Sequence, residues 1–337
     1  MSMTKLSVII HRASTASFKR FFKNVNIVHE ESGRSKPSVL FDMLFCVFRY
    51  GIGYLEYNTF GFAFLDREKR KTFVTMKENN ELVRRLNKRE AYEILDNKLL
   101  FNQKFKDFIK REYLDLRDGV DAFERFLTGK DAFFAKQLDS FGGLGVKKIR
   151  LSEHPEHKKL YDELMESNMY LVESVIEQHP EMSRLCPQAL NTIRITTIVN
   201  DKHEAKVLYA ILRVGNGKSD IDNVTSGGMY TKLDDEGIVR YPMFCDKTAE
   251  TYYVHPNNGF QFEGFQVPYF KEALAFCKKA AYVEPDLRYV GWDVGISPEG
   301  PVLVEGNNLP GYDMPQNHRF RNDGYGMKAV FEEAIRG

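Results

Sequence analysis

Residues 289–307 read YVGWDVGISPEGPVLVEGN and contain two apolar segments on either side of a turn. The turn, SPEG at 297–300, is strong turn sequence, so the two segments are expected to pair as antiparallel strands. Asp293 lies on the first segment, and Glu305 and Asn307 lie on the second. Because alternate residues of a strand face the same side, Glu305 and Asn307 point one way. Carboxylate and amide oxygens without a nearby Cys or His suit Mg²⁺ or Mn²⁺ rather than zinc.

The simpler interpretation of Asp293 is a solvated residue beside a turn, which is common for a single Asp near a strand end. Glu305 is harder to explain in that way, because it follows the apolar residues 302–304. A carboxylate carried into a buried environment needs a cation or a hydrogen-bond donor. The pair of strands therefore predicts a metal site.

A metal held by oxygen ligands commonly binds phosphate as well. Gly142, Gly143 and Gly145 lie between two segments predicted to be extended, 131–138 and 146–151. Main-chain N–H groups of such glycines can approach phosphate oxygens closely. The alternative is an ordinary hairpin tip, since the motif lacks the GK[ST] of a P-loop and opens a strand rather than a helix.

Three cationic side chains are candidates to meet that phosphate. Lys136 precedes Gly142 by six residues, and Lys98 opens an aromatic segment predicted to be helical. For both lysines, exposure to solvent is the default interpretation. Arg194 lies between residues that should be buried on alternate faces, and a guanidinium there needs a carboxylate or phosphate partner.

Composition limits the classes of protein to consider. The chain has 337 residues, is 43% hydrophobic, and carries 48 Lys and Arg against 47 Asp and Glu, a net charge of +1. These values exclude a fibrous or disordered chain and give no overall field that would attract nucleic acid or an anionic membrane, so any anion must be held by a local site. The most apolar early stretch, 39–48, is too short to span a bilayer and is predicted to be a core helix. We therefore expect no membrane span.

The four cysteines suggest a reducing compartment. They are far apart and form no CxxC pair, so zinc spacing and a redox dithiol are both missing. The expected location is cytoplasmic. The cysteines are Cys46, Cys186, Cys245 and Cys277.

The order of the patterns predicts an α+β protein with an N-terminal helical region. Residues 15–96 are helical in character, and strands are expected at 169–176, 192–199 and 205–214. A helix is expected at 269–281. We place the domain boundaries at 1–95, 96–175 and 176–337.

Taken together, these segments resemble the ATP-grasp superfamily, and specifically its sugar-transfer-associated branch. The stretch RYGIGYLEYNTFGFAFLDREKRKTFVT at 49–75 resembles the aromatic leader of that branch. The stretch DNKLLFNQKF at 96–105 resembles the segment that carries its first ATP-contacting lysine. Gly306 is a departure, because many ATP-grasp ligases have a β-branched residue at this point. The resemblance implies the ATP-grasp fold, in which two lobes grip ATP.

The resemblance also implies roles for individual residues. Lys98 and Lys136 would meet the ATP phosphates under a glycine-rich lid at 141–146, and the main chain of 171–175 would read the adenine. Arg194 would stabilise the transferred phosphoryl group, with Lys136 as the second catalytic residue. The residue that contacts the ribose would be Glu177, Gln178 or His179, and the resemblance does not decide among them. The implied nucleotide contacts are Lys98, Lys136, Gly142, Gly143, Gly145, Glu173, Ser174, Val175, Asn191 and Asn223, and the implied magnesium ligands are Asp293, Glu305 and Asn307.

The activity implied by the resemblance is ATP- and Mg²⁺-dependent ligation, with Mn²⁺ as a possible substitute. A carboxylate would become an acyl phosphate that an amine or hydroxyl attacks, during the building or modification of a cell-surface polysaccharide. The alternatives are a kinase that phosphorylates a sugar hydroxyl and a non-catalytic ATP-binding protein. The partner would be a small-molecule or sugar-linked substrate rather than nucleic acid, and the oligomeric state stays open.

Overall fold

The computed structural model describes residues 18–140, 145–217 and 227–337 and divides into two compact units. One unit comprises Met1–Asn79 and Gln316–Ala329, and the other comprises Asn80–Pro315 and Val330–Gly337. Helices and antiparallel sheets occur together, which confirms the α+β class and the helical N-terminal region. The three-part division expected from the sequence stays a prediction. Gly142, Gly143 and Asn223 lie outside the described residues.

The first unit is built from short helices around an aromatic core. Buried Tyr57, Phe60, Phe62 and Phe73 pack against one another with ring centroids 5.0 to 6.1 Å apart. Aromatic pairs at such separations add to the stabilisation that burial supplies. The helices are α2 Phe18–Ser32, α3 Lys36–Tyr50, α4 Tyr54–Thr59, α5 Arg67–Arg70 and the start of α6 Met76–Leu86.

Asp42 organises the charges beside this core. Its carboxylate accepts hydrogen bonds from Arg34 Nη1 (2.7 Å), both Arg70 Nη atoms (2.8 and 2.7 Å) and the Tyr57 hydroxyl (2.6 Å). Burial opposes ionisation of Asp42, but the bonds from Arg70, Tyr57 and Arg34 hold its pKa well below the ordinary 3.8. The ionised form is therefore the one that the fold stabilises.

We expect Asp42→Asn to destabilise the protein by about 3 kcal/mol at neutral pH, because Arg70 loses its charge partner in a buried setting. Since the pKa of Asp42 is lowered, its contribution is full above pH 3.8 and is lost as the pH falls below that value. The variant should therefore lose less stability than the wild type on acidification. Urea unfolding at a series of pH values measures this, and parallel losses in the two proteins would contradict it.

Helix α3 corrects one expectation. Residues 39–48 are helical as predicted, and Val39, Met43 and Cys46 are buried. The opposite face of the helix is not a core face, because Phe41, with 72% of its surface exposed, and Phe48, with 85%, project from it. The sequence showed an apolar stretch, but it could not show that only one side of the helix is covered.

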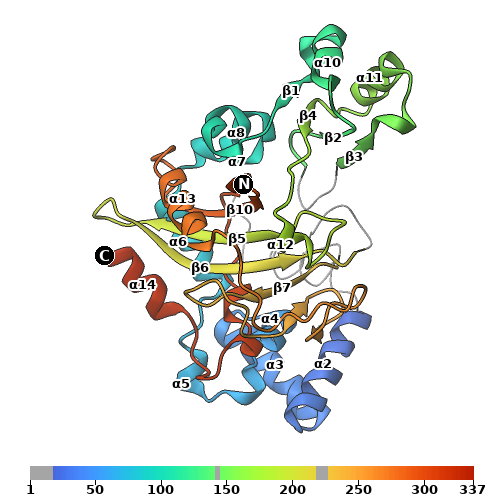
Figure 1. Ribbon diagram of the computed structural model, residues 1–337. Helices are drawn as coiled ribbons and strands as arrows, with labels where there is room; N and C mark the ends of the chain where they lie inside the picture. Colours follow the sequence, from blue (N-terminus) through green and yellow to red (C-terminus); the bar gives the residue numbers. More distant parts are fainter. Residues whose placement is uncertain (1–17, 141–144, 218–226) are drawn as a thin grey trace. The chain divides into compact units, whose positions relative to one another are not determined.

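The second unit contains a four-stranded antiparallel sheet in the order β1-β4-β2-β3. Helices α10 Val120–Leu127 and α11 His157–Glu166 pack together beside it (Figure 1). The predicted hairpin around the glycine-rich segment is β2 paired with β3. Sequence reading missed β1 because it has only three residues. The strands are β1 Tyr113–Asp115, β2 Ala132–Lys136, β3 Val146–Arg150 and β4 Leu171–Ser174.

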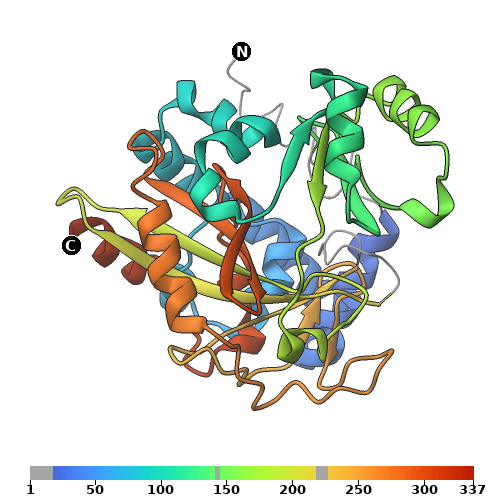
Figure 2. The same ribbon diagram turned by 45° about the horizontal axis from the view of Figure 1, so that its top comes forward.

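The same unit contains a seven-stranded sheet in the order β11-β10-β5-β6-β7-β8-β9. Helix α13 Phe270–Ala280 packs on β5, β6 and β11 (Figure 2). Strands β7, β8 and β9 were not predicted from the sequence, because they are short segments in a stretch rich in Pro and Gly. The strands are β5 Thr192–Val199, β6 Ala205–Val214, β7 Met229–Lys232, β8 Met243–Cys245, β9 Glu250–Tyr252, β10 Tyr289–Ser297 and β11 Gly300–Asn307.

Short helices complete this unit. The four cysteines are buried and free. Across the described ranges, no helix combines the length and apolarity that a membrane span requires. The remaining helices are α7 Tyr92–Asp96, α8 Lys98–Lys104, α9 Lys106–Ile109, α12 Pro180–Ser183 and α14 Lys328–Arg336.

Candidate functional site

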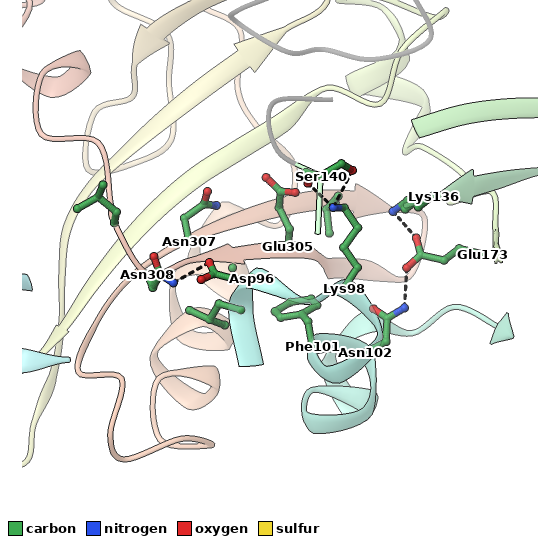
Figure 3. Close-up of a pocket in the computed structure, with 14 residues that line it drawn as sticks. Asp96, Lys98, Phe101, Asn102, Lys136, Ser140, Glu173, Glu305, Asn307 and Asn308 are labelled. Carbon is green, nitrogen blue, oxygen red and sulfur yellow. Dashed lines mark hydrogen bonds and ion pairs between the residues drawn. The ribbon is translucent and has the colours of Figure 1, made fainter. Parts of the chain in front are cut away.

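A pocket of about 380 Å³ lies within the second unit. Four separate segments line it: residues of α7 and α8 between 95 and 102, Lys136 at the end of β2 with Ser140 after it, Glu173 of β4, and residues 304–309 at the end of β11. Figure 3 shows side chains from these segments turned toward the same space. The pocket therefore joins the end of one sheet to the edge strand of the other.

The register of the large sheet places three charged residues in one row. Asp293 of β10 lies opposite Glu305 of β11 on one side and opposite Arg194 of β5 on the other. Directly opposed residues of antiparallel strands carry their side chains on the same face. The predicted pairing of the two strands is thus confirmed, and it brings the two carboxylates together.

Asp293 is held by two arginines. Arg194 donates from Nε to one carboxylate oxygen, and from Nη2 at 3.0 Å to the other. Arg213 of β6 donates to that second oxygen from Nη1 at 2.9 Å. Burial opposes ionisation of Asp293, but these two charges hold its pKa well below its usual range. Both oxygens of this buried carboxylate are therefore already engaged.

Glu305 differs from Asp293 in its exposure and in the direction of its pKa shift. Its side chain is exposed toward the pocket, and protein surrounds it on the other sides. Loss of solvation and the nearby charge of Asp293 raise the pKa of its carboxyl above the ordinary value. Asn307 donates from its amide nitrogen to the Gly291 carbonyl at 3.3 Å, which leaves the amide oxygen as its coordinating atom. Glu305 and Asn307 fit a divalent cation, which would relieve the repulsion between the two carboxylates.

Carboxylates and histidines alone do not form a metal centre here. Among the residues that the structure describes, no group of three or more His, Cys, Asp and Glu side chains could hold a metal. A cation at Glu305 and Asn307 would need further oxygen atoms from water or from a phosphate, as Mg²⁺ commonly does.

Lys136 pairs directly with Glu173 in the wall of the pocket. Its ammonium group forms an ion pair with Glu173 Oε2, while Glu173 Oε1 accepts from Asn102 Nδ2 (2.6 Å) and Arg111 Nη2 (2.9 Å). Burial would raise the pKa of Glu173, but Arg111 and Lys136 together hold it well below its usual range. Glu173 is therefore a fixed negative charge that positions Lys136.

Arg111 also contacts the edge strand of the large sheet. It donates to the carbonyl oxygens of Leu303 (2.5 Å) and Val304 (3.2 Å). These carbonyls belong to an edge strand, which otherwise presents unpaired acceptors. Arg111 thus ties β11 to Glu173 immediately before Glu305.

Lys98 begins α8 and extends to the turn after β2. Its Nζ donates to the Ser140 carbonyl, to the Ser140 hydroxyl at 3.2 Å and to the Leu138 carbonyl at 3.4 Å (Figure 3). Burial lowers the pKa of Lys98, and the charge of Glu305 opposes that shift. Lys98 and Glu305 both line the pocket (Figure 3), so one ligand bound there could contact both.

Close packing of neighbouring side chains explains why position 306 is a glycine. A Cβ atom at this position would lie 2.9 Å from Leu95 Cδ2 and 3.2 Å from the rings of Phe101 and Trp292. Such distances are too short for ordinary contacts, so a β-branched residue does not fit beside α7 and α8. The glycine allows the helices to pack closely under Glu305.

Asn191 does not line the pocket. It is fully buried, and its amide nitrogen donates to Gln178 Oε1 (3.0 Å), the Met182 carbonyl (3.0 Å) and the Cys186 carbonyl (2.9 Å). Gln178 in turn donates to the carbonyls of Cys186 and Ala189. Asn191 therefore stabilises the loop around α12 through these hydrogen bonds.

The structure brings five of the predicted residues into the pocket, while Asp293 and Arg194 lie in the row next to Glu305 and do not line it. Ser174 is the last residue of β4, and Val175, which follows it, is exposed. Gly145 accepts from the Gln137 amide at the described base of the hairpin loop. The five are Lys98, Lys136, Glu173, Glu305 and Asn307.

Sequence reading missed Arg111, Arg213 and Asn102. Arg213 could have been found, because it is a charged residue in the apolar segment 205–214 and needs a partner there. Arg111 carries no such signal, since it stands next to Lys110 and Glu112, and Asn102 is a single amide after the apolar residues 99–101 with nothing in the sequence that points to a partner.

The family model described as sugar-transfer associated ATP-grasp matches residues 77–319, well over half of the chain. No match was found among curated proteins.

Several solved structures are similar in fold at low identity. The ATP-grasp ligase PsnB with its minimal precursor is 12% identical, with a TM-score of 0.43 over 74% of this chain and 63% of that chain. The D-alanine-D-alanine ligase from Coxiella burnetii is 11% identical, with a TM-score of 0.42 over 72% and 56%. N5-carboxyaminoimidazole synthetase from Staphylococcus aureus with ADP is 9% identical, with a TM-score of 0.46 over 78% and 58%. The chain spans less than two thirds of the length of each.

Proposed function

Because the chain belongs to the sugar-transfer-associated ATP-grasp family, we propose that it is an ATP- and Mg²⁺-dependent ligase. It activates a carboxylate as an acyl phosphate, which an amine or hydroxyl then attacks. The substrate is a small-molecule or sugar-linked acid used in a cell-surface polysaccharide, and the reaction takes place in the cytoplasm. The observation that supports this proposal is the pocket that joins Lys98 and Lys136 with Glu305 and Asn307.

In this proposal the triphosphate lies between the two lysines and the end of β11. Lys98 and Lys136 neutralise its phosphates. Glu305 and Asn307 would hold the metal ion, whose positive charge would help to neutralise the phosphates. Asp293 fixes Arg194 and Arg213 in place and adds a metal ligand only if one arginine moves.

Adenine recognition falls to the main chain after β4. Because the Glu173 carboxylate is held by Arg111, Asn102 and Lys136, it serves to position Lys136 rather than to contact adenine. The main chain at Ser174 and Val175 is the proposed hinge. Gln178 is occupied by Asn191, so we assign the ribose contact to exposed Glu177.

The chemistry needs no protein nucleophile. The substrate carboxylate oxygen attacks the γ-phosphorus and the bond to ADP breaks, which gives ADP and an acyl phosphate. The acceptor then attacks the carbonyl carbon, loses a proton and expels inorganic phosphate. We assign stabilisation of the charge on the transferred group to Arg194, which lies in the row beside Glu305 rather than in the pocket wall. Most of the catalysis in this proposal is positioning and electrostatics.

A product test separates this reaction from its alternatives. The protein is incubated with ATP, Mg²⁺ and a panel of acids, amines and nucleotide sugars. Hydroxylamine should trap the acyl phosphate as a hydroxamate, with ADP released. A phosphorylated acceptor without inorganic phosphate would instead indicate a kinase, and absence of turnover with every acceptor would favour a non-catalytic ATP-binding protein.

We expect Lys136→Ala to weaken ATP binding about tenfold to a hundredfold, because one hydrogen bond to a charged group is lost. Isothermal titration calorimetry measures the affinity. Lys130→Ala is the matched control, since Lys130 also pairs with a glutamate, Glu112, but outside the pocket. Equal affinities in Lys136→Ala and the wild type would show that Lys136 does not meet the phosphates.

A further inference from the structure

Helix α3 of the first unit is apolar on two opposite sides. Val39, Met43 and Cys46 are buried. Because successive residues of an α-helix are rotated by about 100°, Phe41, Leu44, Phe45 and Phe48 lie about half a turn away from them. These four side chains, which we call the α3 aromatic face, are all exposed. A helix that is apolar all round is normally covered on every side.

A positively charged recess adjoins the α3 aromatic face. Phe41 and Phe45 form part of its wall, together with the guanidinium groups of Arg34, Arg67 and Arg70. The recess has a volume of about 490 Å³ and contains one carboxylate, Asp42, against three arginines. Asp42 pairs with Arg34 and Arg70. Arg67 is exposed and forms no ion pair within the described ranges.

Neighbouring α2 has the same combination of residues. It exposes Phe18 and Phe22 together with Arg20 and Lys23. The sequence contains no acidic residue before Glu30. Aromatic side chains next to basic ones are typical of helices that lie in a membrane surface, where rings enter the acyl boundary and cations meet lipid phosphates.

We propose that the α3 aromatic face docks on an anionic phospholipid membrane, with a lipid phosphate group held at Arg67. The helix lies in the interface and does not cross it, in keeping with the length of the described helices. A second copy of the chain is the less suitable occupant. In a symmetric dimer the same patch meets itself, so two positively charged recesses would face each other.

Vesicle flotation with the full chain tests this proposal. Wild-type protein should float with vesicles of phosphatidylcholine mixed with phosphatidylglycerol, and much less with phosphatidylcholine alone. The double variant Phe41→Ser, Phe48→Ser should partition about tenfold or more weakly, because two exposed rings no longer leave water. Arg67→Glu should remove most of the preference for the anionic vesicles. Tyr253→Ser is the matched control, since Tyr253 is a well-exposed aromatic residue of the other unit.

A fluorescent reporter provides a second measurement that does not depend on loss of function. The chain has one tryptophan, Trp292, which is buried. Phe48→Trp should therefore show a new blue shift on addition of anionic vesicles and should be quenched by brominated lipid. Circular dichroism checks that each variant is folded.

Three results would overturn the proposal. The first is wild-type protein that stays unbound in the presence of anionic vesicles. The second is emission of the Phe48→Trp variant that those vesicles leave unchanged. The third is a wild-type dimer that the double variant dissociates, measured by sedimentation without lipid, which would assign the face to a second copy.

Discussion

Glu305→Gln should reduce Mg²⁺-dependent ATP turnover about a thousandfold, which corresponds to about 4 kcal/mol of lost transition-state stabilisation. Glutamine keeps the size of the side chain but removes the charge that we propose to hold the metal ion. Because Glu305 faces a pocket and is repelled by Asp293, the change should not lower stability. The expected result is thus a stable protein without activity, measured by ADP release and by thermal unfolding.

Glu299→Gln is the control for this prediction. It makes the same chemical change on the same hairpin, but at the turn that joins β10 and β11 rather than in the pocket. Its activity should be close to that of the wild type. Full activity in Glu305→Gln would remove Glu305 from the metal site, and equal loss in both variants would point to a general effect of charge.

Unlike Glu305→Gln, Asp293→Asn should lower stability, by about 3 to 5 kcal/mol. Asp293 is 3% exposed and is the shared partner of Arg194 and Arg213. Without its charge, two guanidinium groups remain in a buried sheet without a carboxylate partner. Activity should fall too, since Arg194 would lose its position. Urea denaturation gives the free energy of unfolding.

Asp201→Asn is a matched comparison, because Asp201 also pairs with two arginines, Arg85 and Arg288, but is half exposed. Its loss should change stability little, since exposed ion pairs are weakly stabilising. If Asp293→Asn were as stable as Asp201→Asn, the account of Asp293 as a buried anchor would be incorrect.

Much of the second unit could be predicted from its sequence. Strands β5, β6, β10 and β11 are long and apolar, and the turn at 297–300 fixes how the last two pair, so their positions follow from local pattern. Continued without a break, that pairing would set Asp293 opposite Val304. A β-bulge between Asp293 and Val294, which the sequence did not predict, sets it opposite Glu305 instead. The confirmed fold class rests on these elements.

The electrostatic partners could not be predicted in the same way. Arg111 and Glu173 are 62 residues apart, and Arg194 and Asp293 are 99 apart. Nothing local indicates that Arg111 meets Glu173, or that Arg213 joins Arg194 on one carboxylate. The sequence therefore located acidic and basic candidates, whereas only the tertiary structure showed which charges neutralise each other and which face the pocket.

The most direct test of the proposed site is a crystal structure with a non-hydrolysable ATP analogue and Mn²⁺. We expect an anomalous Mn²⁺ peak between Glu305, Asn307 and the phosphate oxygens, with Lys98 and Lys136 on the triphosphate. A nucleotide bound elsewhere, or a Mn²⁺ peak away from Glu305, would contradict the account.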